Sequence, residues 1–352
     1  MHRLALAAWA HGDRDGAQAL AEYAWGLFPI GSSLGRVVPQ VETAFTLAGI
    51  ATERTAHSEA THWLERAVRL LDRAPECPMR ARWLVEARTR LGETRRLAAD
   101  YDEAKCTLHL ALEMAETHHL NLTSRAAVHN CLGILAKDTG RYKEAAEHYQ
   151  EALQMLTAEL GAEDAALAGV YHNLAGLAHI QGRYTEAESA IRTALTLRVR
   201  SASSDAVGVA ADTSVLGAVL AGQGRLDDAE AALHDAQRLW ESLHGSEHYE
   251  IAVVVHNLAD IHRQRGHLSA AHSAYVQALR LKEAVLNLDH PEIAALHHNI
   301  AALLEQQQRP AEALEHYDRA LAVFHATVGE DHPNAQVCAA NRNHLIAATP
   351  NY

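Results

Sequence analysis

Gly140-Arg141-Tyr142-Lys143-Glu144-Ala145 is repeated forty-two residues further on as Gly182-Arg183-Tyr184-Thr185-Glu186-Ala187. Weakened forms return at the same spacing as residues 224–229, 266–271 and 308–313. Self-similarity at a fixed period of this length is the sequence signature of a stacked repeat protein. Because such a stack presents a long surface rather than a single cavity, the pattern favours binding over catalysis.

The position of the first glycine, which we call the slot, extends upstream to Ala99, Thr55 and Gly12 at spacings of 41, 44 and 43 residues. The chain therefore holds eight units, of which the first three are the least regular. A chain that turns between antiparallel helices often needs a positive φ where the first helix ends, and glycine adopts it without strain. The slot thus predicts the turn between two helices in each unit.

Two alanines follow the slot in every unit, five and twelve residues after it. They are Ala17, Ala24, Ala60, Ala67, Ala104, Ala111, Ala145, Ala152, Ala187, Ala194, Ala229, Ala236, Ala271, Ala278, Ala313 and Ala320. A spacing of seven residues places both on one face of a helix, where small side chains let a neighbouring helix approach closely. An apolar residue stands eight positions before each slot: Leu4, Leu47, Leu91, Leu132, Leu174, Leu216, Leu258 and Ile300. We expect this apolar ridge to face the alanines.

This pattern resembles the tetratricopeptide repeat family over nearly the whole chain. The forty-two-residue period, the phrases Asp289-His290-Pro291 and Asp331-His332-Pro333, and the Asn-Leu-Ala phrases at 173–175 and 257–259 are similar to the kinesin-light-chain type. The resemblance implies an all-α, right-handed α-solenoid of about eight helix pairs followed by a C-terminal capping helix.

We expect one solenoid over residues 1–352. Its repeats are less regular over 1–120 and regular over 121–330, and a polar capping helix spans 334–347. The prolines and glycines between Pro29 and Pro39 predict a long loop over residues 28–40.

Composition excludes several classes of partner. The net charge is -13, and it is concentrated after residue 100, so we expect no binding to nucleic acid or to acidic membranes. No apolar run approaches the roughly 20 residues that span a bilayer. Four scattered cysteines without a Cys-x-x-Cys pair are typical of reduced thiols, and we therefore expect a cytoplasmic protein.

The residue just before the apolar ridge of the first helix is the main candidate for binding, because the resemblance places it on the concave face. It is an asparagine in four places: Asn173, Asn257, Asn299 and Asn341. An amide offers both a donor and an acceptor, which suits the backbone of an extended peptide. The alternative is that each amide only bonds a neighbouring repeat.

Histidines His172, His256 and His298 stand beside three of these asparagines, and His179 lies six residues after Asn173. Equivalent residues of adjacent repeats stand about 10 Å apart, too far to share a metal ion, so we expect no metal site. Three more histidines, His248, His290 and His332, recur every forty-two residues in the linkers and are expected to be architectural.

Basic residues follow at related positions of the first helices: Arg90, Arg96, Lys137 and Arg263. They predict a preference for an acidic peptide or a carboxylate. Ion pairs with Glu93 and Asp138 on a solvated helix face explain Arg96 and Lys137 nearly as well.

No phosphate loop, nucleophile elbow or paired catalytic carboxylates are present, so we predict neither catalytic residues nor a cofactor. The expected function is a non-catalytic scaffold that holds an extended segment of a protein or peptide partner. A regulatory sensor whose superhelix responds to a peptide or small ligand is the first alternative. An enzyme that uses the histidines of the groove is the second.

Overall fold

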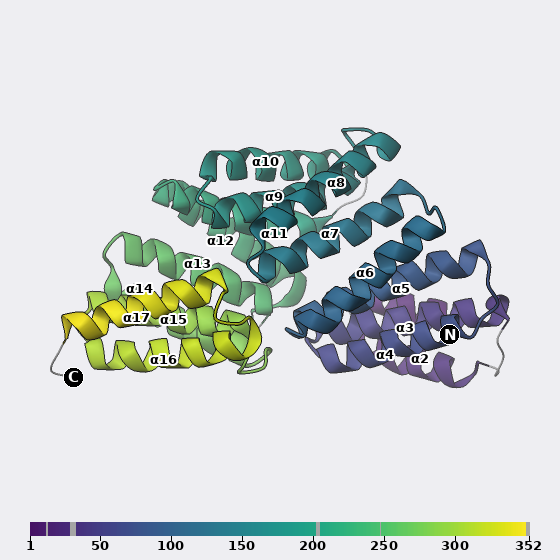
Figure 1. Cartoon of the computed structure of the whole chain (residues 1–352), viewed down its shortest axis with the longest axis horizontal. Coiled ribbons are helices and arrows are strands. Elements are labelled where there is room, and N and C mark those ends of the chain that lie inside the picture. The colour runs from purple at the N-terminus through teal and green to yellow at the C-terminus, as the bar shows by residue number, and fades with distance from the viewer. Residues whose placement is uncertain (12, 29–32, 202–204, 247, 350–352) are drawn as a thin grey trace. The chain divides into compact units, whose positions relative to one another are not determined.

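The computed structural model describes residues 1–11, 13–28, 33–201, 205–246 and 248–349. Over these residues the chain is all-α, with seventeen α-helices, one short 3-10 helix and no strand (Figure 1). The helices are α1 (His2–Ala10), α2 (Arg14–Gly26), α3 (Leu34–Glu53), α4 (His57–Asp72), α5 (Pro78–Leu97), α6 (Tyr101–Thr117), α7 (Leu122–Asp138), α8 (Tyr142–Leu160), η1 (Ala165–Leu167), α9 (Ala168–Ile180), α10 (Tyr184–Arg200), α11 (Ala206–Gly222), α12 (Leu226–His244), α13 (Tyr249–Gln264), α14 (Leu268–Glu283), α15 (Pro291–Gln306), α16 (Pro310–Thr327) and α17 (Pro333–Ala348).

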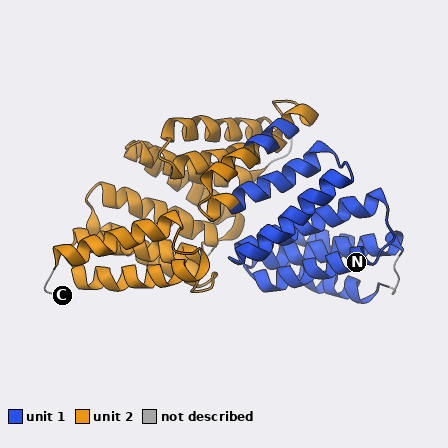
Figure 2. Cartoon of the chain, in the orientation of Figure 1, with its two compact units in different colours: residues 1–135, 150–155 blue, residues 136–149, 156–352 orange. Residues whose placement is uncertain are grey.

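The chain divides into two compact units (Figure 2). The first unit comprises residues 1–135 and 150–155, and the second comprises residues 136–149 and 156–352. Within the first unit, α1 packs on α2, α3 on α4 and α5 on α6. Within the second, α9 packs on α10, α11 on α12, α13 on α14 and α15 on α16, and α17 lies against α16 and α15. Helix pairs followed by a last single helix confirm the predicted α-solenoid fold class.

The slot takes a left-handed backbone conformation in all seven units where it is described. Glycines at 140, 182, 224 and 266 have φ between 71° and 77°, and Thr55, Ala99 and Gln308 have φ of 57°, 61° and 60°. After each slot, the next backbone N–H returns to a carbonyl of the helix just ended, as from Arg183 to Ala178 at 2.9 Å. This is the Schellman arrangement that ends a helix. Gly12 lies outside the described residues.

All sixteen repeated alanines are buried, none more than 4% exposed. Five residues of the apolar ridge are buried as expected, and Leu174 and Leu216 are half-buried. Leu4 departs from the pattern, because it is 55% exposed on the nine-residue helix α1. Burial of the alanines is therefore common to all eight units, whereas burial of the ridge residue differs from unit to unit.

The three linker histidines cap helices. The Nδ1 atoms of His248, His290 and His332 accept hydrogen bonds from the backbone N–H two residues later, at 3.3, 3.2 and 3.1 Å. They thereby satisfy donors at the starts of α13, α15 and α17 that have no partner within the helix. This matches the architectural role expected for them.

The predicted loop over 28–40 is wrong for its described C-terminal part, because α3 begins at Leu34 and contains Pro39. Residues 29–32 lie outside the described part. Burial of Val37, Val41 and Ala44 outweighs the helix-breaking tendency of the proline. Tertiary packing has overridden local propensity at this site.

Among the described residues, no helix combines the length and the apolar character needed to cross a membrane. All four cysteines are free.

Candidate functional site

The four predicted asparagines lie half-buried on the first helices of the second unit and on α17. Asn299 places its Nδ2 atom 2.8 Å from Nε2 of His256, which belongs to the preceding helix pair. Asn341 hydrogen-bonds the hydroxyl of Tyr317. Both amides therefore bind a neighbour, as the alternative interpretation held. Asn257 differs, because its amide has no hydrogen-bond partner among the residues that the structure describes.

His256 and Tyr275 form the centre of a polar cluster between α13 and α14. Their rings meet edge to face with centroids 5.7 Å apart. The Tyr275 hydroxyl donates to Asp260, and Arg263 approaches the same carboxylate to 3.5 Å. Burial lowers the pKa of His256, with Asp260 opposing the shift. A neutral His256 accepts the Asn299 N–H at Nε2 and carries its proton on Nδ1, since one imidazole nitrogen must be an acceptor.

The next pair repeats the ring contact and has its tyrosine hydroxyl on a different carboxylate. The rings of His298 and Tyr317 meet at 5.6 Å, and the Tyr317 hydroxyl donates to Glu305. Nδ1 of His298 is buried and has no hydrogen-bond partner in the described part of the chain, and burial lowers the pKa of this histidine. A His–Tyr contact thus recurs in successive pairs, and the acid that accepts the tyrosine hydrogen bond changes from Asp260 to Glu305.

His172 and His179 have structural partners. Nδ1 of His172 lies 2.7 Å from Oδ1 of Asp212, a fully buried carboxylate whose other oxygen receives Nε of Arg198 at 2.7 Å. His179 packs against Tyr184 at 5.6 Å, and burial lowers its pKa while a hydrogen bond to the backbone of Ala218 raises it. Asp212 was not predicted. The sequence did contain a signal for it, because the equivalent positions of other repeats carry the apolar residues Val170, Val254 and Leu296.

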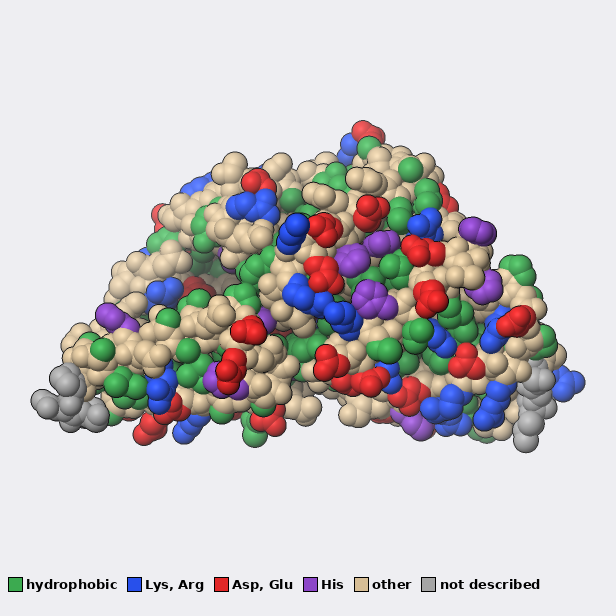
Figure 3. Space-filling view, in the orientation of Figure 1, with side chains coloured by type: hydrophobic (Ala, Val, Ile, Leu, Met, Phe, Trp, Pro, Cys, Tyr) green, Lys and Arg blue, Asp and Glu red, His purple; other side chains and the backbone are tan. Residues whose placement is uncertain are grey.

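The predicted basic residues all have an acidic neighbour. Arg90 pairs with Glu86 at 2.8 Å, Arg96 with Glu93 at 3.0 Å, Lys137 with Asp138 at 3.5 Å and Arg263 with Asp260 at 3.5 Å. Arg90 and Arg96 belong to the first unit, and Lys137 and Arg263 to the second. Figure 3 likewise shows acidic and basic side chains interspersed over the visible face. An acidic ligand would therefore have to displace a partner already in place.

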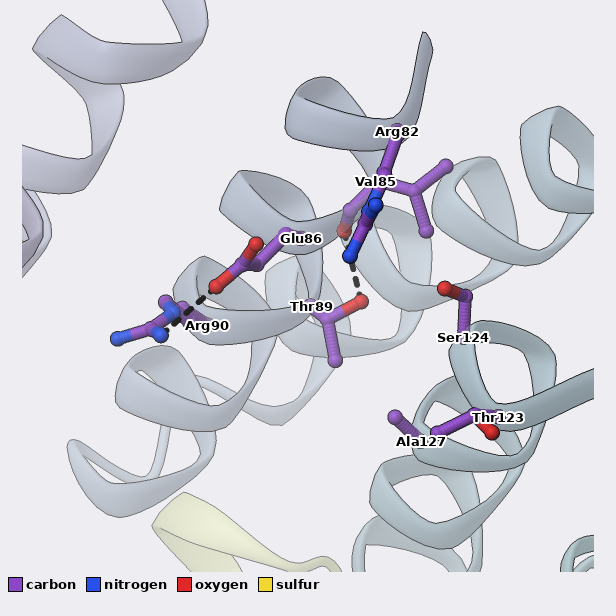
Figure 4. Close-up of a pocket in the computed structure, with 8 residues that line it drawn as sticks. All are labelled: Arg82, Val85, Glu86, Thr89, Arg90, Thr123, Ser124 and Ala127. Carbon is purple, nitrogen blue, oxygen red and sulfur yellow. Dashed lines mark hydrogen bonds and ion pairs between the residues drawn. The ribbon is translucent and has the colours of Figure 1, made fainter. Parts of the chain in front are cut away.

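A cavity of about 330 Å³ lies in the first unit between α5 and α7 (Figure 4). Arg82, Glu86 and Arg90 line it at four-residue spacing along one face of α5, and Ser124 contributes a hydroxyl from the first turn of α7. Arg82 is exposed and has no ion-pair partner in the described residues. It was missed from the sequence, although its spacing of eight residues from Arg90 places it on the same helix face.

Known proteins share the repeat pattern of this chain. The profile of the tetratricopeptide repeat family matches residues 124–198, 209–284 and 292–341, more than half of the chain. No curated protein matches.

Solved structures with a similar fold include a Rap protein complexed with competence and sporulation factor, which has a TM-score of 0.62 and 13% identity and covers 98% of this chain and 96% of that one. The apo form of RapI has a TM-score of 0.59 and 15% identity over 80% of this chain and 97% of its own. BtubC (BKLC) from P. vanneervenii has a TM-score of 0.50 and 22% identity over 66% and 91%. The family match, the left-handed slots and the buried alanines agree, and the chain belongs to the tetratricopeptide repeat family.

Proposed function

We propose that this protein is a non-catalytic scaffold of the cytoplasm that holds an extended segment of another polypeptide on the first helices of its pairs. Asn257 is the central binding residue, and Asn173, Asn299 and Asn341 extend the row. The histidines beside them supply ring surface and hydrogen bonds rather than acid–base chemistry. Binding works by positioning, since an amide row reads the backbone of a peptide and not its sequence.

One observation carries this proposal. Asn257 is half-buried, and its amide has no hydrogen-bond partner among the described residues, whereas Asn299 and Asn341 each bind a neighbour. An amide without a protein partner that still reaches solvent can exchange its water for a ligand that supplies both a carbonyl and an N–H. Asn257 is therefore the member of the row best prepared to bind a peptide backbone.

Two similar folds support a peptide as the ligand. The Rap protein described above was solved with competence and sporulation factor, and the Rap conjugation gene regulator of plasmid pLS20 was solved with the Phr* peptide. The second structure has a TM-score of 0.55 and 17% identity to this chain. At this identity the likeness concerns the fold, so the residues that would hold a peptide here are argued from this chain alone.

The preference for an acidic partner rests on Arg82 more than on the other basic residues. Arg90, Arg96, Lys137 and Arg263 are already paired with acids, so a ligand would have to compete with those acids. Arg82 has no such partner and borders the cavity of Figure 4. Within the first unit, Arg82 is therefore the basic residue of this cavity that can receive a carboxylate without displacing an acid.

The test is a comparison of Asn257→Ala with Asn299→Ala on a peptide selected from a random library displayed against the full chain. Loss of two hydrogen bonds to the ligand should weaken binding of Asn257→Ala roughly tenfold, with the thermal midpoint unchanged. Asn299→Ala should lower the thermal midpoint, because it removes the contact with His256. Isothermal titration and circular dichroism measure the two effects.

Equal affinities of wild-type protein and the Asn257→Ala variant for every selected peptide would reject the amide row. Failure to select any peptide, in a library where a peptide-binding control is recovered, would reject the scaffold function itself.

A further inference from the structure

We infer that the first unit carries a second binding site, separate from the peptide groove, for a phosphate monoester attached to an apolar group. The site is a cavity of about 340 Å³ among α4, α5 and α6. This volume lies at the lower end of the range for small-molecule pockets, roughly 300–1,000 Å³. None of its lining residues belongs to the predicted peptide-binding set.

Helix periodicity brings three arginines to this cavity. Arg69 is on α4, four residues after Glu65, and Arg88 and Arg95 lie two turns apart on one face of α5. Glu65 is the only acid that lines the cavity as described, and it holds Arg69 at 3.3 Å and Arg95 at 3.1 Å through its two oxygens. The wall thus has an excess of two positive charges in a chain whose net charge is -13.

Arg88 is the guanidinium most available to a ligand. Its ion pair with Asp72 is long, at 3.5 Å, and Glu65 of the cavity wall holds Arg69 and Arg95 more closely. The outer partners Asp72 and Glu103 are both more than 40% exposed and do not line the cavity. Solvent screens such exposed pairs, so a ligand inside the cavity competes with them at little cost.

The charge and the polar groups favour phosphate over carboxylate. A phosphate monoester carries about -1.5 to -2 at neutral pH, which matches the excess, whereas a carboxylate would leave one guanidinium uncompensated. Guanidinium groups bind phosphate oxygens in a bidentate manner. The hydroxyl of Thr107 already accepts from Arg95 at 2.6 Å and fixes that guanidinium at the cavity wall.

The remaining wall is apolar. Val68, Leu91 and Leu110 come from α4, α5 and α6, and Leu110 is 42% exposed although it is a large hydrophobic residue. A ligand with a hydrocarbon or aromatic body would cover this surface, which bare phosphate would leave in water. The lining therefore fits an organic phosphate rather than the inorganic ion.

In the experiment the full chain is titrated with phenyl phosphate, inorganic phosphate and benzoate at constant ionic strength, and calorimetry measures the affinity for each. Phenyl phosphate should bind best of the three. The Arg88→Gln variant should lose roughly tenfold in affinity, and Glu65→Gln should gain, because it frees Arg69 and Arg95 for the ligand. The gain is the decisive result, since a residue with only a structural role would not improve anion binding when its charge is removed.

Arg73→Gln is the matched control, because Arg73 is exposed next to Asp72 and does not line the cavity. Circular dichroism verifies that each variant is folded, and a variant that unfolds is replaced by Arg69→Gln. No saturable binding of phenyl phosphate, equal binding of all three probes, or an equal loss in Arg73→Gln would overturn the assignment.

An N-acetylated phosphotyrosine amide that binds at least as well as phenyl phosphate would identify a phosphorylated side chain as the source of the phosphate, and weaker binding would identify a small phosphate ester.

Discussion

The two compact units share one backbone plan but satisfy their buried polar side chains differently. In the first unit the four buried threonines donate to the carbonyl four residues earlier on the same helix: Thr43, Thr46, Thr94 and Thr107. In the second unit, buried Asp212, Lys282 and His297 bind groups on other helices. The threonine hydroxyls of the first unit thus donate within their own helices, although Thr107 also accepts from Arg95 of α5, whereas the buried charged and titratable groups of the second unit bind across helices.

The links of the second unit are charged or titratable. Lys282 donates to Glu292 at 2.5 Å and joins α14 to α15, and Nδ1 of His297 lies 2.9 Å from Nδ1 of His316 between α15 and α16. Burial lowers the pKa of His2 in the first unit, and of His179, His256, His297 and His298 among others in the second. The second unit therefore ties its helices through buried titratable groups, whereas the ion pairs that join helices of the first unit, such as Arg95 with Glu65, are partly exposed.

The largest effect is expected from breaking the buried link at Asp212. Asp212→Ala leaves Arg198 and His172 without their shared carboxylate and should lower the free energy of unfolding by about 3 kcal/mol. Glu186→Ala, which removes an exposed partner of Arg183 in the same unit, should cost less than about 1 kcal/mol. Urea denaturation measures both, and similar losses for the two variants would remove the distinction between linked and solvated charges.

Lowering the pH should produce the next largest difference in stability between the two units. Burial and the neighbouring His316 lower the pKa of His297 to about 4, so the folded state binds fewer protons than the unfolded chain, whose histidine titrates near 6.5. The stability that depends on a neutral, buried His297 is fully present above pH 6.5 and is lost as the pH falls towards 4. At pH 5 the free energy of unfolding should be lower by roughly 2 kcal/mol. Hydrogen exchange at pH 7 and 5 should show greater loss of protection in α13 to α16 than in α3 to α6.

His297→Leu serves as the control for that experiment, because it removes the titrating group from a site that is only 8% exposed. The variant should show a flatter dependence of stability on pH than the wild-type chain. Equal loss of protection in both units would mean that the His297–His316 contact does not set the acid response.

The smallest effects concern the slot, where the two units differ in residue but not in conformation. Ala99→Gly should stabilise the first unit by about 0.5 kcal/mol, because it relieves an L-residue with φ of 61°. Gly224→Ala should destabilise the second unit by about 1 kcal/mol through φ alone, since an added Cβ would meet no atom within 4 Å. Thermal midpoints measure both, and changes of the same sign would show that φ does not control these turns.

The fold was predictable from the sequence because two local requirements recur. The left-handed turn and the buried alanine pair depend on neighbours within one or two helices, so Ala187 and Ala194 fix the packing of their pair whatever the rest of the chain does. The loop expected over 28–40 failed for the opposite reason, since only contacts from outside the segment decide whether Pro39 can stay in a helix.

The candidate site was harder to predict, because it depends on which side chains meet across helices. The repeat register placed Asn257 and Asn299 on first helices and Asn341 on the last single helix, but it did not show that Asn299 would bind His256 or that Asn341 would bind Tyr317. For Arg96 the sequence left open a role in binding an acidic ligand and an ion pair with Glu93, and the structure has that ion pair at 3.0 Å. Pairing of this kind follows from rotamers, which the period of a repeat does not encode.

The sixteen alanine contacts also determine how such a chain can change length. Each pair offers its successor nearly the same small-residue surface, at positions forty-two residues apart in the regular part of the chain. A segment of that length can therefore be duplicated or excised with its edges still matching, while an insertion within a helix would bring bulky residues to the alanine positions. The number of helix pairs should therefore vary between related chains by whole pairs, and in the regular part of this chain one pair corresponds to forty-two residues.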